Sequence, residues 1–356
     1  MARQWILARQ EGFEASLEFK ENLHIPSAKD LAPDEVLVKL MAASLNYREL
    51  VIPDPKGING PITPPVIPAC DGAGVVEAVG SAVTEFTPGD RVVTQTNPAP
   101  SQRAGDDEPL GLGDAVGCLG QGRPGTLTSF GVFQEKGLVH APKSLNWLEA
   151  ATLTCTFATG WNALFGVKGK EPGPGAWILV QGTGGVSIAT LQLAVAAGAT
   201  VVATTSSEDR AARLKSLGAA HVVNYKTNPN WGLEARALTP GGRGFDNVVD
   251  VGGYATVAQS LAAVRVDGIV HMVGAVGGNA EPVPLMAVFM AACSVRVFFT
   301  STRNQFKELV KFMDAKEVKP AMDDVVFELA EAKEAYRRLN EKKHFAKVMI
   351  RIDHEE

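Results

Sequence analysis

Cysteine is scarce in this chain, and the spacing of the few cysteines excludes several kinds of site. No two lie close enough to form a C-x-x-C pair, so a compact cysteine metal cluster or redox motif is not expected. The N-terminal segment 1–10 has no long apolar core of the signal-peptide type. A disulfide framework is therefore not expected, and the sequence favours a protein of the reducing cytosol. The four cysteines are Cys70, Cys118, Cys155 and Cys293.

A strong charge of either sign is also lacking. The formal net charge is −5 and no basic stripe stands out, so we expect no nucleic-acid partner. The uncharged run 186–206 has the length of a membrane span, but Gly198-Ala199-Thr200 divides it into a helix, a turn and a strand, so we expect no membrane partner. Hydrophobic residues make up 46% of the 356 residues and charged residues 21%, which is typical of a packed globular protein with two domains.

Glycines are concentrated after a short apolar run at residues 177–187, which read WILVQGTGGVS. Such glycines let the backbone approach a pyrophosphate, and the helix that follows offers free N–H groups and the positive end of its dipole. Ser187 stands where a complete G-x-G-x-x-G motif has its third glycine, so a tight structural turn is the alternative. The predicted pyrophosphate contacts are Gly182, Thr183, Gly184, Gly185 and Val186.

Residues 175–300 alternate between apolar, strand-like runs and helix-like segments. Fully apolar strands separated by helices predict a parallel sheet covered on both faces, here a doubly wound nucleotide-binding domain of α/β class. The predicted strands are 176–181, 200–205, 221–224, 245–251, 268–274 and 295–301, and the predicted helices lie near 184–198, 207–217, 254–264 and 284–293.

The flanking regions follow another pattern. Short strand-like pieces such as 35–40 and 74–79 are bounded by Pro, Gly and Asp turns, which predicts an antiparallel, barrel-like domain over residues 1–150. Residues 96–127 have no clear periodicity, so they form either a functional lid beside a site or a surface insertion. Toward the C-terminus we expect helices at 304–315 and 330–342 and a last strand at 347–352.

Seven short motifs in this order resemble those of the medium-chain dehydrogenase/reductase superfamily, most of all its zinc-independent branch of quinone-oxidoreductase-like and alcohol-dehydrogenase-like reductases. The resemblance implies a GroES-like, partly open β-barrel catalytic domain, 1–156 and 302–356, around an inserted Rossmann domain, 157–301. The motifs are SLNYRE at 44–49, IPACDGAGVV at 67–76, PGDRV at 88–92, AATL at 150–153, TGW at 159–161, LGA at 217–219 and HFAKV at 344–348.

The resemblance also bears on zinc. Zinc-bearing relatives hold catalytic zinc with Cys, His and Cys, and the matching positions here are Asn46, Cys70 and Cys155. Asparagine is a poor zinc ligand, so we expect a metal-free enzyme with no metal-site residues. One alternative is a site built from the two cysteines with Glu49 or Asp71. Another interpretation makes both cysteines small buried apolar residues.

The second predicted strand indicates which nicotinamide cofactor is preferred. NAD-preferring members end this strand with an acid, whereas this strand runs into Ser206 and Ser207, and Glu208 and Asp209 fit the first turn of a capped helix. The two serines and Arg210 suit a 2′-phosphate, and the resemblance places Tyr225 near it. We therefore expect NADPH; Arg210 on a solvated helix face is the alternative.

Further roles rest on the resemblance. Asn46 and Tyr47 match the Asn-Tyr pair that lines the family's site. The amide can donate to a substrate oxygen or position the cofactor, and the hydroxyl can donate a hydrogen bond or a proton. The alternative for Tyr47 is an aromatic of the barrel core. For Arg48 of this chain we expect a scaffolding pair with Glu49 or Asp71 rather than a catalytic role. The remaining cofactor contacts implied are Thr159 beside the nicotinamide, Val273 and Gly274 at its carboxamide, and Lys347 at the phosphates, although Ala346 replaces the family's usual glycine. The alternative for Lys347 is an exposed lysine at the start of a strand.

The expected activity is NADPH-dependent hydride transfer to an activated C=C of an enone or quinone. A carbonyl reductase or alcohol dehydrogenase that uses NADP(H) is one alternative, and a non-catalytic NADPH-binding protein is another. The sequence does not name the small-molecule substrate. A homodimer is a further expectation, because relatives often pair through the sheet edge that matches 295–301, which is rich in apolar residues here.

Overall fold

The computed structural model describes residues 1–55, 60–97, 105–278 and 280–354. The chain divides into two units. The first unit comprises residues 1–158 and 300–356, and the second comprises residues 159–299. These junctions differ by two residues each from the boundaries expected at 156/157 and 301/302.

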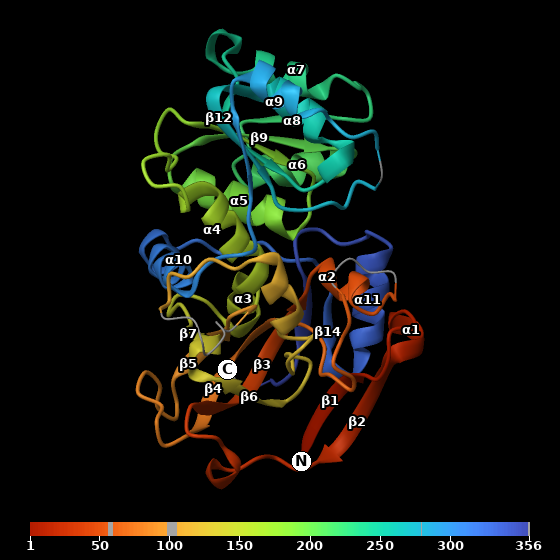
Figure 1. Cartoon of the computed structure of the whole chain (residues 1–356), viewed down its shortest axis with the longest axis vertical. Helices are drawn as coiled ribbons and strands as arrows, with labels where there is room; N and C mark the ends of the chain where they lie inside the picture. Colours follow the sequence, from red (N-terminus) through yellow and green to blue (C-terminus); the bar gives the residue numbers. More distant parts are fainter. Residues whose placement is uncertain (56–59, 98–104, 279, 355–356) are drawn as a thin grey trace. The chain divides into compact units, whose positions relative to one another are not determined.

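The first unit is built on antiparallel strands around β3 (Figure 1). In the described part of the chain, its main sheet has the order β14-β15-β3-β4-β5-β7, with β6 paired to β3, and β1 and β2 form a separate two-stranded sheet. The strands are β1 Ala2–Leu7, β2 Leu17–Leu23, β3 Glu35–Leu45, β4 Asp71–Val79, β5 Arg91–Thr94, β6 Phe130–Gln134, β7 Leu138–His140, β14 Val326–Glu328 and β15 Val348–Arg351.

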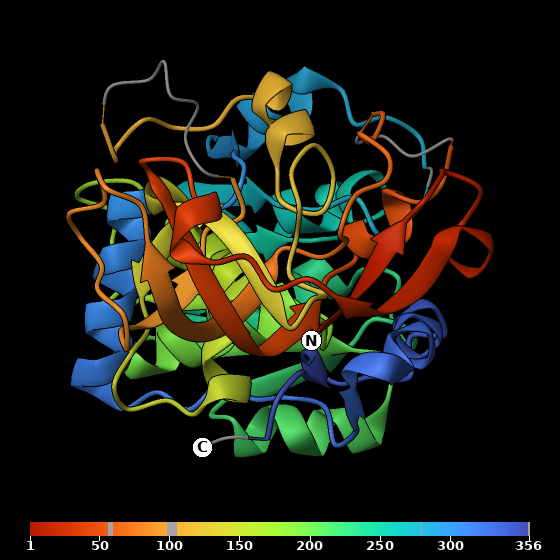
Figure 2. The ribbon, with the colours of Figure 1, turned by 90° about the horizontal axis from the view of Figure 1, so that it is seen from below.

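Helices flank these strands. Figure 2 shows α10 and α11 on opposite sides of the curved strands of the first unit. Apolar side chains of α11 and of β3 lie in one buried core, in which Tyr336, Leu40 and Val348 are almost completely enclosed. The helices are α1 Phe13–Ser16, α2 Arg48–Val51, α3 Trp147–Ala150, α10 Arg303–Lys316 and α11 Ala332–Asn340; α4 Ala158–Phe165 begins at the junction with the second unit.

The described part of the 96–127 segment is anchored by charge. The Asp106 carboxylate accepts hydrogen bonds from Lys136, Lys307 and Arg303, at 2.8 to 3.0 Å. Burial alone would raise the pKa of Asp106, but the hydrogen bonds from Lys307 and Lys136, with the charge of Arg303, bring it below its ordinary value. The segment around Asp106 is thus held to α10, and residues 98–104 of the expected lid or surface insertion lie outside the described residues.

The second unit contains the parallel sheet expected from the sequence (Figure 1). Over the described residues its strands have the order β10-β9-β8-β11-β12-β13, in which the direction of winding reverses between β8 and β11. The strands are β8 Trp177–Gln181, β9 Thr200–Thr205, β10 His221–Asn224, β11 Phe245–Asp250, β12 Val264–Met272 and β13 Ser294–Val297, and the helices are α5 Gly185–Ala196, α6 Glu208–Ser216, α7 Trp231–Ala237, α8 Val257–Ala263 and α9 Leu285–Ala291.

Several details differ from the expected elements, among them the start of β12, which lies at Val264 instead of 268. Helix α7 was not expected; it is short, and its inward anchors, Trp231 and Ala235, stand one turn apart. Strand β13 ends at Val297 instead of 301, and Thr300 has a φ of 37°, which an extended strand does not allow. Helix α8 begins three residues late because a turn at Gly253, with a φ of 68°, precedes it.

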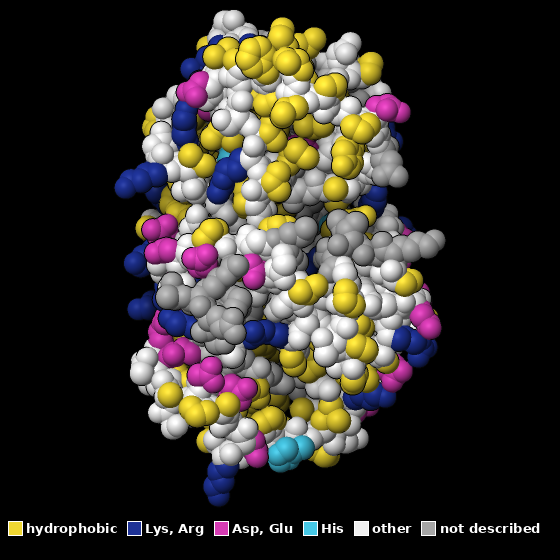
Figure 3. Space-filling model, viewed as in Figure 1, with side chains coloured by type: hydrophobic (Ala, Val, Ile, Leu, Met, Phe, Trp, Pro, Cys, Tyr) yellow, Lys and Arg dark blue, Asp and Glu magenta, His cyan; other side chains and the backbone are white. Residues whose placement is uncertain are grey.

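Helix α9 presents apolar side chains to the outside. Leu285, Phe289 and Met290 are each at least 75% exposed, and Val297 on the neighbouring edge strand β13 is 66% exposed. Figure 3 shows hydrophobic side chains gathered where Figure 1 places α9. Contiguous exposed apolar surface of this kind is typical of an interaction site.

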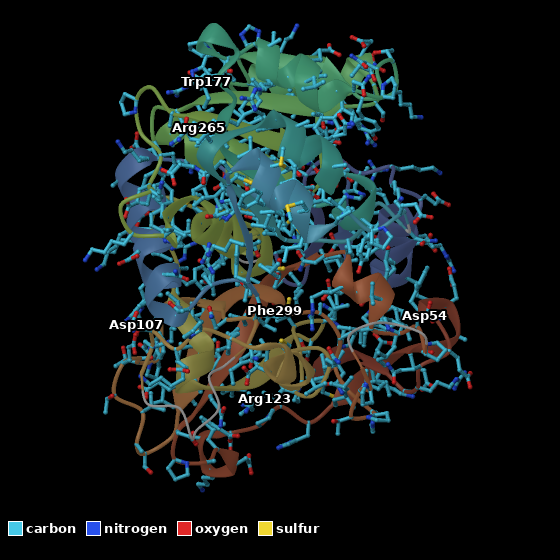
Figure 4. All side chains as sticks on the ribbon, turned by 45° about the horizontal axis from the view of Figure 1, so that its top comes forward. Asp54, Asp107, Arg123, Trp177, Arg265 and Phe299 are labelled. Atoms are coloured by element: carbon cyan, nitrogen blue, oxygen red, sulfur yellow. The ribbon has the colours of Figure 1, made fainter. Side chains whose placement is uncertain are left out.

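A network of polar groups lies at the N-terminal ends of strands β8, β11 and β12. Trp177 and Arg265, labelled in Figure 4, both donate to Asp246: the Trp177 backbone N–H at 2.7 Å and the Arg265 Nε at 2.6 Å. These bonds fix the starts of β8 and β11 against β12. Among the described residues, no helix is long and apolar enough to cross a membrane.

His271 is enclosed near the C-terminal end of β12, and its Nε2 lies 2.9 Å from the Asn247 Oδ1 on β11. Burial, aided by the charge of Arg296, lowers the pKa of His271 to about 3. An unfolded histidine takes up a proton near pH 6.5, so the unfolded chain binds more protons than the native one between that pH and about 3. Acidification through this window therefore favours unfolding.

We predict that the free energy of unfolding of the wild type falls by up to ~2 kcal/mol more between pH 6.5 and 5 than that of His271→Gln. Urea titrations at several pH values measure the two slopes. His221→Gln, which changes an exposed histidine of β10, is the matched control and should keep the wild-type slope. Equal slopes for wild type and His271→Gln would contradict the buried neutral histidine.

Candidate functional site

The glycine turn of the second unit leads from β8 into α5. Gly182 has a φ of 76°, and a Cβ added at Gly182 or Gly184 would meet no heavy atom within 4 Å. Gly184 caps α5 without a side chain and is exposed, so the first N–H groups of this 12-residue helix have no side-chain acceptor there. An open turn and an uncapped helix N-terminus fit a dinucleotide pyrophosphate, with Gly185 and Val186 in the first turn.

Ser187 performs a packing role in this motif. It is buried, and its hydroxyl donates to the Gln181 carbonyl at 2.6 Å, which ties α5 to the end of β8. Gly160 allows another close approach, because a Cβ there would stand 3.0 Å from the Thr190 Oγ1 on α5. Thr159, next to it, is buried. The incomplete motif therefore still packs the helix closely, with a hydrogen bond in place of the third glycine.

The end of β9 carries hydroxyls and an arginine. The Arg210 Nη1 donates to the Thr183 Oγ1 at 3.3 Å, so the guanidinium reaches from α6 back to the glycine turn rather than pointing away from it. Ser207 caps α6, with its Oγ 3.5 Å from the Arg210 backbone nitrogen, and Ser206 lies between this cap and the strand. The Tyr225 backbone N–H donates to the Thr205 carbonyl at 3.1 Å and brings Tyr225 to the same strand end.

A buried carboxylate organises the neighbouring strand end. Asp250, the last residue of β11, accepts hydrogen bonds from the Gly252 and Gly253 N–H groups, and from the Thr256 and Ser260 hydroxyls. The Gln181 side chain of β8 also donates to it, at 3.3 Å. These bonds shape the turn after β11.

Val273 and Gly274 follow β12 at the same edge of the sheet. The Val273 N–H donates to the Asp250 carbonyl at 2.9 Å, and a Cβ on Gly274 would stand 2.7 Å from the Val251 carbonyl oxygen. Both residues are partly buried. The sequence-predicted cofactor residues of the second unit thus lie at the carboxyl ends of β8, β9, β10 and β12, apart from Thr159 on α4.

In the first unit, strand register brings together residues that are far apart in the chain. Ser44 on β3 is paired with Asp71 on β4 and with Met349 on β15. Leu45 is paired with Val348, so one further step of the antiparallel register sets Lys347 opposite Asn46. The C-terminal strand therefore delivers a lysine to the end of β3.

Lys347 is 2% exposed, and its ammonium has three oxygen acceptors. The Nζ donates to the Leu45 carbonyl at 2.9 Å, to the Asn46 Oδ1 at 2.5 Å and to the Asp71 Oδ2 at 2.9 Å. The resemblance implied a contact with the cofactor phosphates; in the structure the ammonium's three hydrogens are directed at acceptors of the first unit. Asp71 also accepts from the Ser44 hydroxyl at 2.9 Å.

Asn46 and Tyr47 stand at the start of α2. The Asn46 side chain is buried, and its backbone N–H donates to the Glu49 Oε2 at 2.6 Å. The Arg48 Nη1 donates to the Glu49 Oε1 at 2.9 Å and to the Leu119 carbonyl at 3.0 Å, which is the scaffolding role expected from the sequence. Tyr47 is 48% exposed. A fixed amide thus adjoins an accessible phenol.

The positions that would hold zinc carry a different chemistry. The Asn46 Nδ2 lies 3.7 Å from the Cys70 Sγ, and the thiol donates to the Asp71 Oδ1 at 3.2 Å. A hydrogen bond with Cys155, together with burial, raises the pKa of the Cys70 thiol well above its ordinary value. Cys155 itself lies in a π-helical turn, Leu153–Phe157, and is partly buried.

This donor set does not fit a catalytic zinc. Such sites use three protein ligands from Cys, His and carboxylate side chains. Here the third position beside the two thiols is the Asn46 amide, and its oxygen already accepts a hydrogen bond from the Lys347 ammonium. Glu49 and Asp71, the carboxylates considered as replacements, are engaged by Arg48 and by Lys347. Over the described residues, no group of three or more His, Cys, Asp or Glu side chains is placed to hold a metal ion.

The sequence analysis did not predict that Asn46, Asp71 and Lys347 form one buried cluster. It treated Asp71 and Glu49 only as partners of Arg48 or of zinc, and it assigned Lys347 elsewhere. The available signal was the charged residues within the motifs SLNYRE, ACDGAG and HFAKV, because a charge enclosed by apolar strands requires a partner. The register that selects the partner is not visible in one sequence.

Comparisons with known proteins agree with this architecture. Residues 32–143 match the family model described as the alcohol dehydrogenase GroES-like domain, and residues 185–315 match that of the zinc-binding dehydrogenase. A zinc-type alcohol dehydrogenase-like protein of Schizosaccharomyces pombe is 39% identical over 94% of this chain and 94% of its own.

Solved structures give the same result. A putative alcohol dehydrogenase from Sinorhizobium meliloti has a TM-score of 0.86 at 34% identity, and covers 99% of this chain and 98% of its own. A structure named as an NAD-dependent alcohol dehydrogenase has a TM-score of 0.85 at 33% identity, over 99% and 100% of the two chains. More distant relatives are named as reductases of 2-haloacrylate and of 2-methylene-furan-3-one and as a quinone oxidoreductase.

The chain belongs to the medium-chain dehydrogenase/reductase superfamily. The resemblance inferred from its motifs and the fold class, a GroES-like sheet domain with a Rossmann domain, are thereby confirmed. The family is one of oxidoreductases that use a nicotinamide cofactor.

Proposed function

We propose that the protein is a zinc-independent, NADPH-dependent reductase that delivers hydride to an activated C=C of an enone or quinone. Bound NADPH would supply the hydride and leave as NADP⁺. The chain would bind the dinucleotide on its second unit and would donate hydrogen bonds to the substrate oxygen from its first unit. In an enone, negative charge develops on that oxygen as hydride adds to the β-carbon, and a proton then completes the α-carbon.

The observation that carries this proposal is the adjacent pair Asn46 and Tyr47. One is a buried amide and the other a phenol that is 48% exposed. Together they offer two hydrogen-bond donors at the end of β3, in surroundings that do not fit a catalytic zinc. Fixed donors stabilise a developing oxyanion by electrostatic preorganisation, so a metal is not required for that task.

Relatives support both the proposal and its main alternative. Names such as 2-haloacrylate reductase and 2-methylene-furan-3-one reductase favour reduction of a C=C next to a carbonyl or carboxyl group. The structural neighbour named as an NAD-dependent alcohol dehydrogenase favours carbonyl chemistry and the other cofactor. Product identification separates these two reactions, since one yields a saturated ketone and the other an alcohol.

The preference for NADPH rests on the end of β9. Thr205, Ser206 and Ser207 place hydroxyls where an acid would bind the ribose 2′-OH. Arg210 reaches from α6 to the glycine turn, so its guanidinium lies on the side of the helix from which a 2′-phosphate could be bound. Glu208, the first acid, accepts from the Asn224 side chain at 3.2 Å instead.

We also propose that the protein forms a homodimer. Strand β13 is the edge of its sheet within the described residues, and its unpaired backbone groups can pair with those of a second copy. The exposed apolar side chains of Leu285, Phe289, Met290 and Val297 would be buried by the same association.

The free thiols are consistent with the cytosolic location expected from the sequence.

The first prediction concerns the cofactor. Protein dialysed against a metal chelator should bind NADPH tightly and NADH weakly, and Arg210→Glu should raise the Kd for NADPH by roughly 10- to 100-fold, because a charged hydrogen bond becomes a repulsion. Fluorescence titration measures both affinities. Lys215→Glu, the same charge change at an exposed site of α6, should have little effect. Equal affinity for NADH would contradict the preference.

The second prediction concerns the donors. Asn46→Ala should lower kcat for enones or quinones by roughly 10²- to 10³-fold with little change in NADPH affinity, because it removes a donor that acts on the transition state. Tyr47→Phe should also lower kcat, whereas Tyr254→Phe, an exposed tyrosine of the second unit, should not. Wild-type NADPH binding without oxidation across a broad acceptor panel would favour a non-catalytic binding protein.

The third prediction concerns assembly. Light scattering should report twice the chain mass for the wild type, and Val297→Arg should shift the protein toward the monomer by placing a charge on the edge strand. Leu233→Arg, at an apolar residue of α7 that is 56% exposed, is the matched control and should leave the dimer intact. A monomeric wild type at micromolar concentration would exclude this interface.

A further inference from the structure

The Asn46 side chain is held by a donor that permits only one orientation of its amide. A lysine ammonium has three hydrogens and no acceptor. The atom of Asn46 that lies 2.5 Å from the Lys347 Nζ is therefore the carbonyl oxygen, since the flipped amide would set an NH₂ group against an NH₃⁺ group. The amide nitrogen must then face the opposite way.

The opposite side of the amide faces the thiol. Its Nδ2 lies 3.7 Å from the Cys70 Sγ, a weak acceptor. Of the two hydrogens on this nitrogen, one points toward the sulfur, and the second is the donor that the proposed function assigns to the substrate oxygen. The orientation of this donor thus depends on Lys347.

The position of Lys347 is itself fixed. Its carbonyl accepts from the Asp323 N–H at 2.9 Å, and the Asp323 carboxylate is paired with Arg338 of α11. The preceding residue, Ala346, is buried and has a φ of 58°, a left-handed conformation that costs about 1 kcal/mol for a residue other than glycine. Asp71 holds the ammonium at 2.9 Å. Strain maintained next to a buried charge is typical of a functional position.

We propose that Lys347 is a positioning residue of the reductase, one that orients the Asn46 amide and strengthens its N–H as a donor. The ammonium draws electron density from the amide carbonyl, and hydrogen bonds in series polarise one another, so the donated hydrogen carries more positive charge. The cation thereby acts on the developing oxyanion through one amide, in surroundings where a buried charge is poorly screened. This inference rests on the proposed function, because that function gives Asn46 its role.

Three substitutions separate this role from a structural one. Lys347→Met removes the ammonium but leaves Asp71 buried without its cation, which can prevent folding. Lys347→Met combined with Asp71→Asn removes both charges and preserves the shape of both side chains approximately, so it keeps the test open. Lys343→Met changes an exposed lysine paired with Glu341 at 2.7 Å and is the matched control.

The kinetic test uses the full-length protein with NADPH and the best acceptor of the screen. The neutral double variant should lower kcat by roughly 10- to 100-fold, with NADPH affinity changed less than twofold. In an Asn46→Ala background the same two changes should cost less than a further twofold, because the group through which Lys347 acts is gone. Losses that multiply in that background would overturn the inference, as would a raised Kd for NADPH with unchanged kcat, which would assign Lys347 to the cofactor phosphates.

A second readout does not depend on turnover. The side-chain amide resonances of Asn46, identified by their loss in Asn46→Ala, should shift in the neutral double variant and stay in place in Lys343→Met. Unshifted resonances would overturn the inference even in a protein that binds NADPH without oxidising it. Shifted resonances in a protein with no reductase activity would instead mean that the orientation is correct and the proposed function is wrong.

Discussion

The buried carboxylate of Asp71 is the constraint on which the rest of the first unit's site depends. It joins three strands, because it accepts from Ser44 on β3, starts β4 itself, and pairs with Lys347 at the entry to β15. A carboxylate that is completely enclosed by apolar strands is tolerated only where a cation or several hydrogen-bond donors compensate its charge, and Asp71 has both. The need to neutralise Asp71 therefore brings in the lysine, and the lysine in turn fixes the amide of Asn46.

The second unit solves the same problem without a cation. Asp250 is also fully enclosed, and it is stabilised by backbone N–H groups, two hydroxyls and the Gln181 side chain. Neutral donors spread the charge over a turn and make that turn rigid, whereas a lysine concentrates a compensating charge at one point. In the second unit the donors to Asp250 thus shape the turn after β11. In the first unit the positive charge of Lys347 is concentrated beside Asn46.

Much of the second unit could be predicted from the sequence, because its buried parallel strands are continuous apolar runs and its turn glycines mark the ends of elements. Helix α7 was not predicted because it is short and only two inward-facing side chains, Trp231 and Ala235, mark its apolar face, so the sequence shows little helical periodicity there. The direction of Arg210 was undecided for a different reason. Its helix offers the guanidinium both solvent and the glycine turn, and only the distance to Thr183 distinguishes them.

The first unit was harder to predict because its site is assembled by strand register. The motifs identified Asn46 and Tyr47, but the pairing of β3 with both β4 and β15 decides which charged residue meets which, and a shift of one residue would reverse every side chain. The resemblance implied a phosphate contact for Lys347, and its position opposite Asn46 became visible only from the register.

The strand pairing of β3 with β15 also sets an order of assembly during synthesis. Ser44, Asn46, Glu49 and Asp71 leave the ribosome about 280 residues or more before Lys347, and the whole second unit is made in between. That unit has its own buried core, and within the described residues all strands of its sheet come from residues 177–297. Until the last segment is made, Asp71 lacks the ammonium that compensates its charge in the folded protein. The cluster around Asp71 can therefore be completed only after the whole second unit has been made.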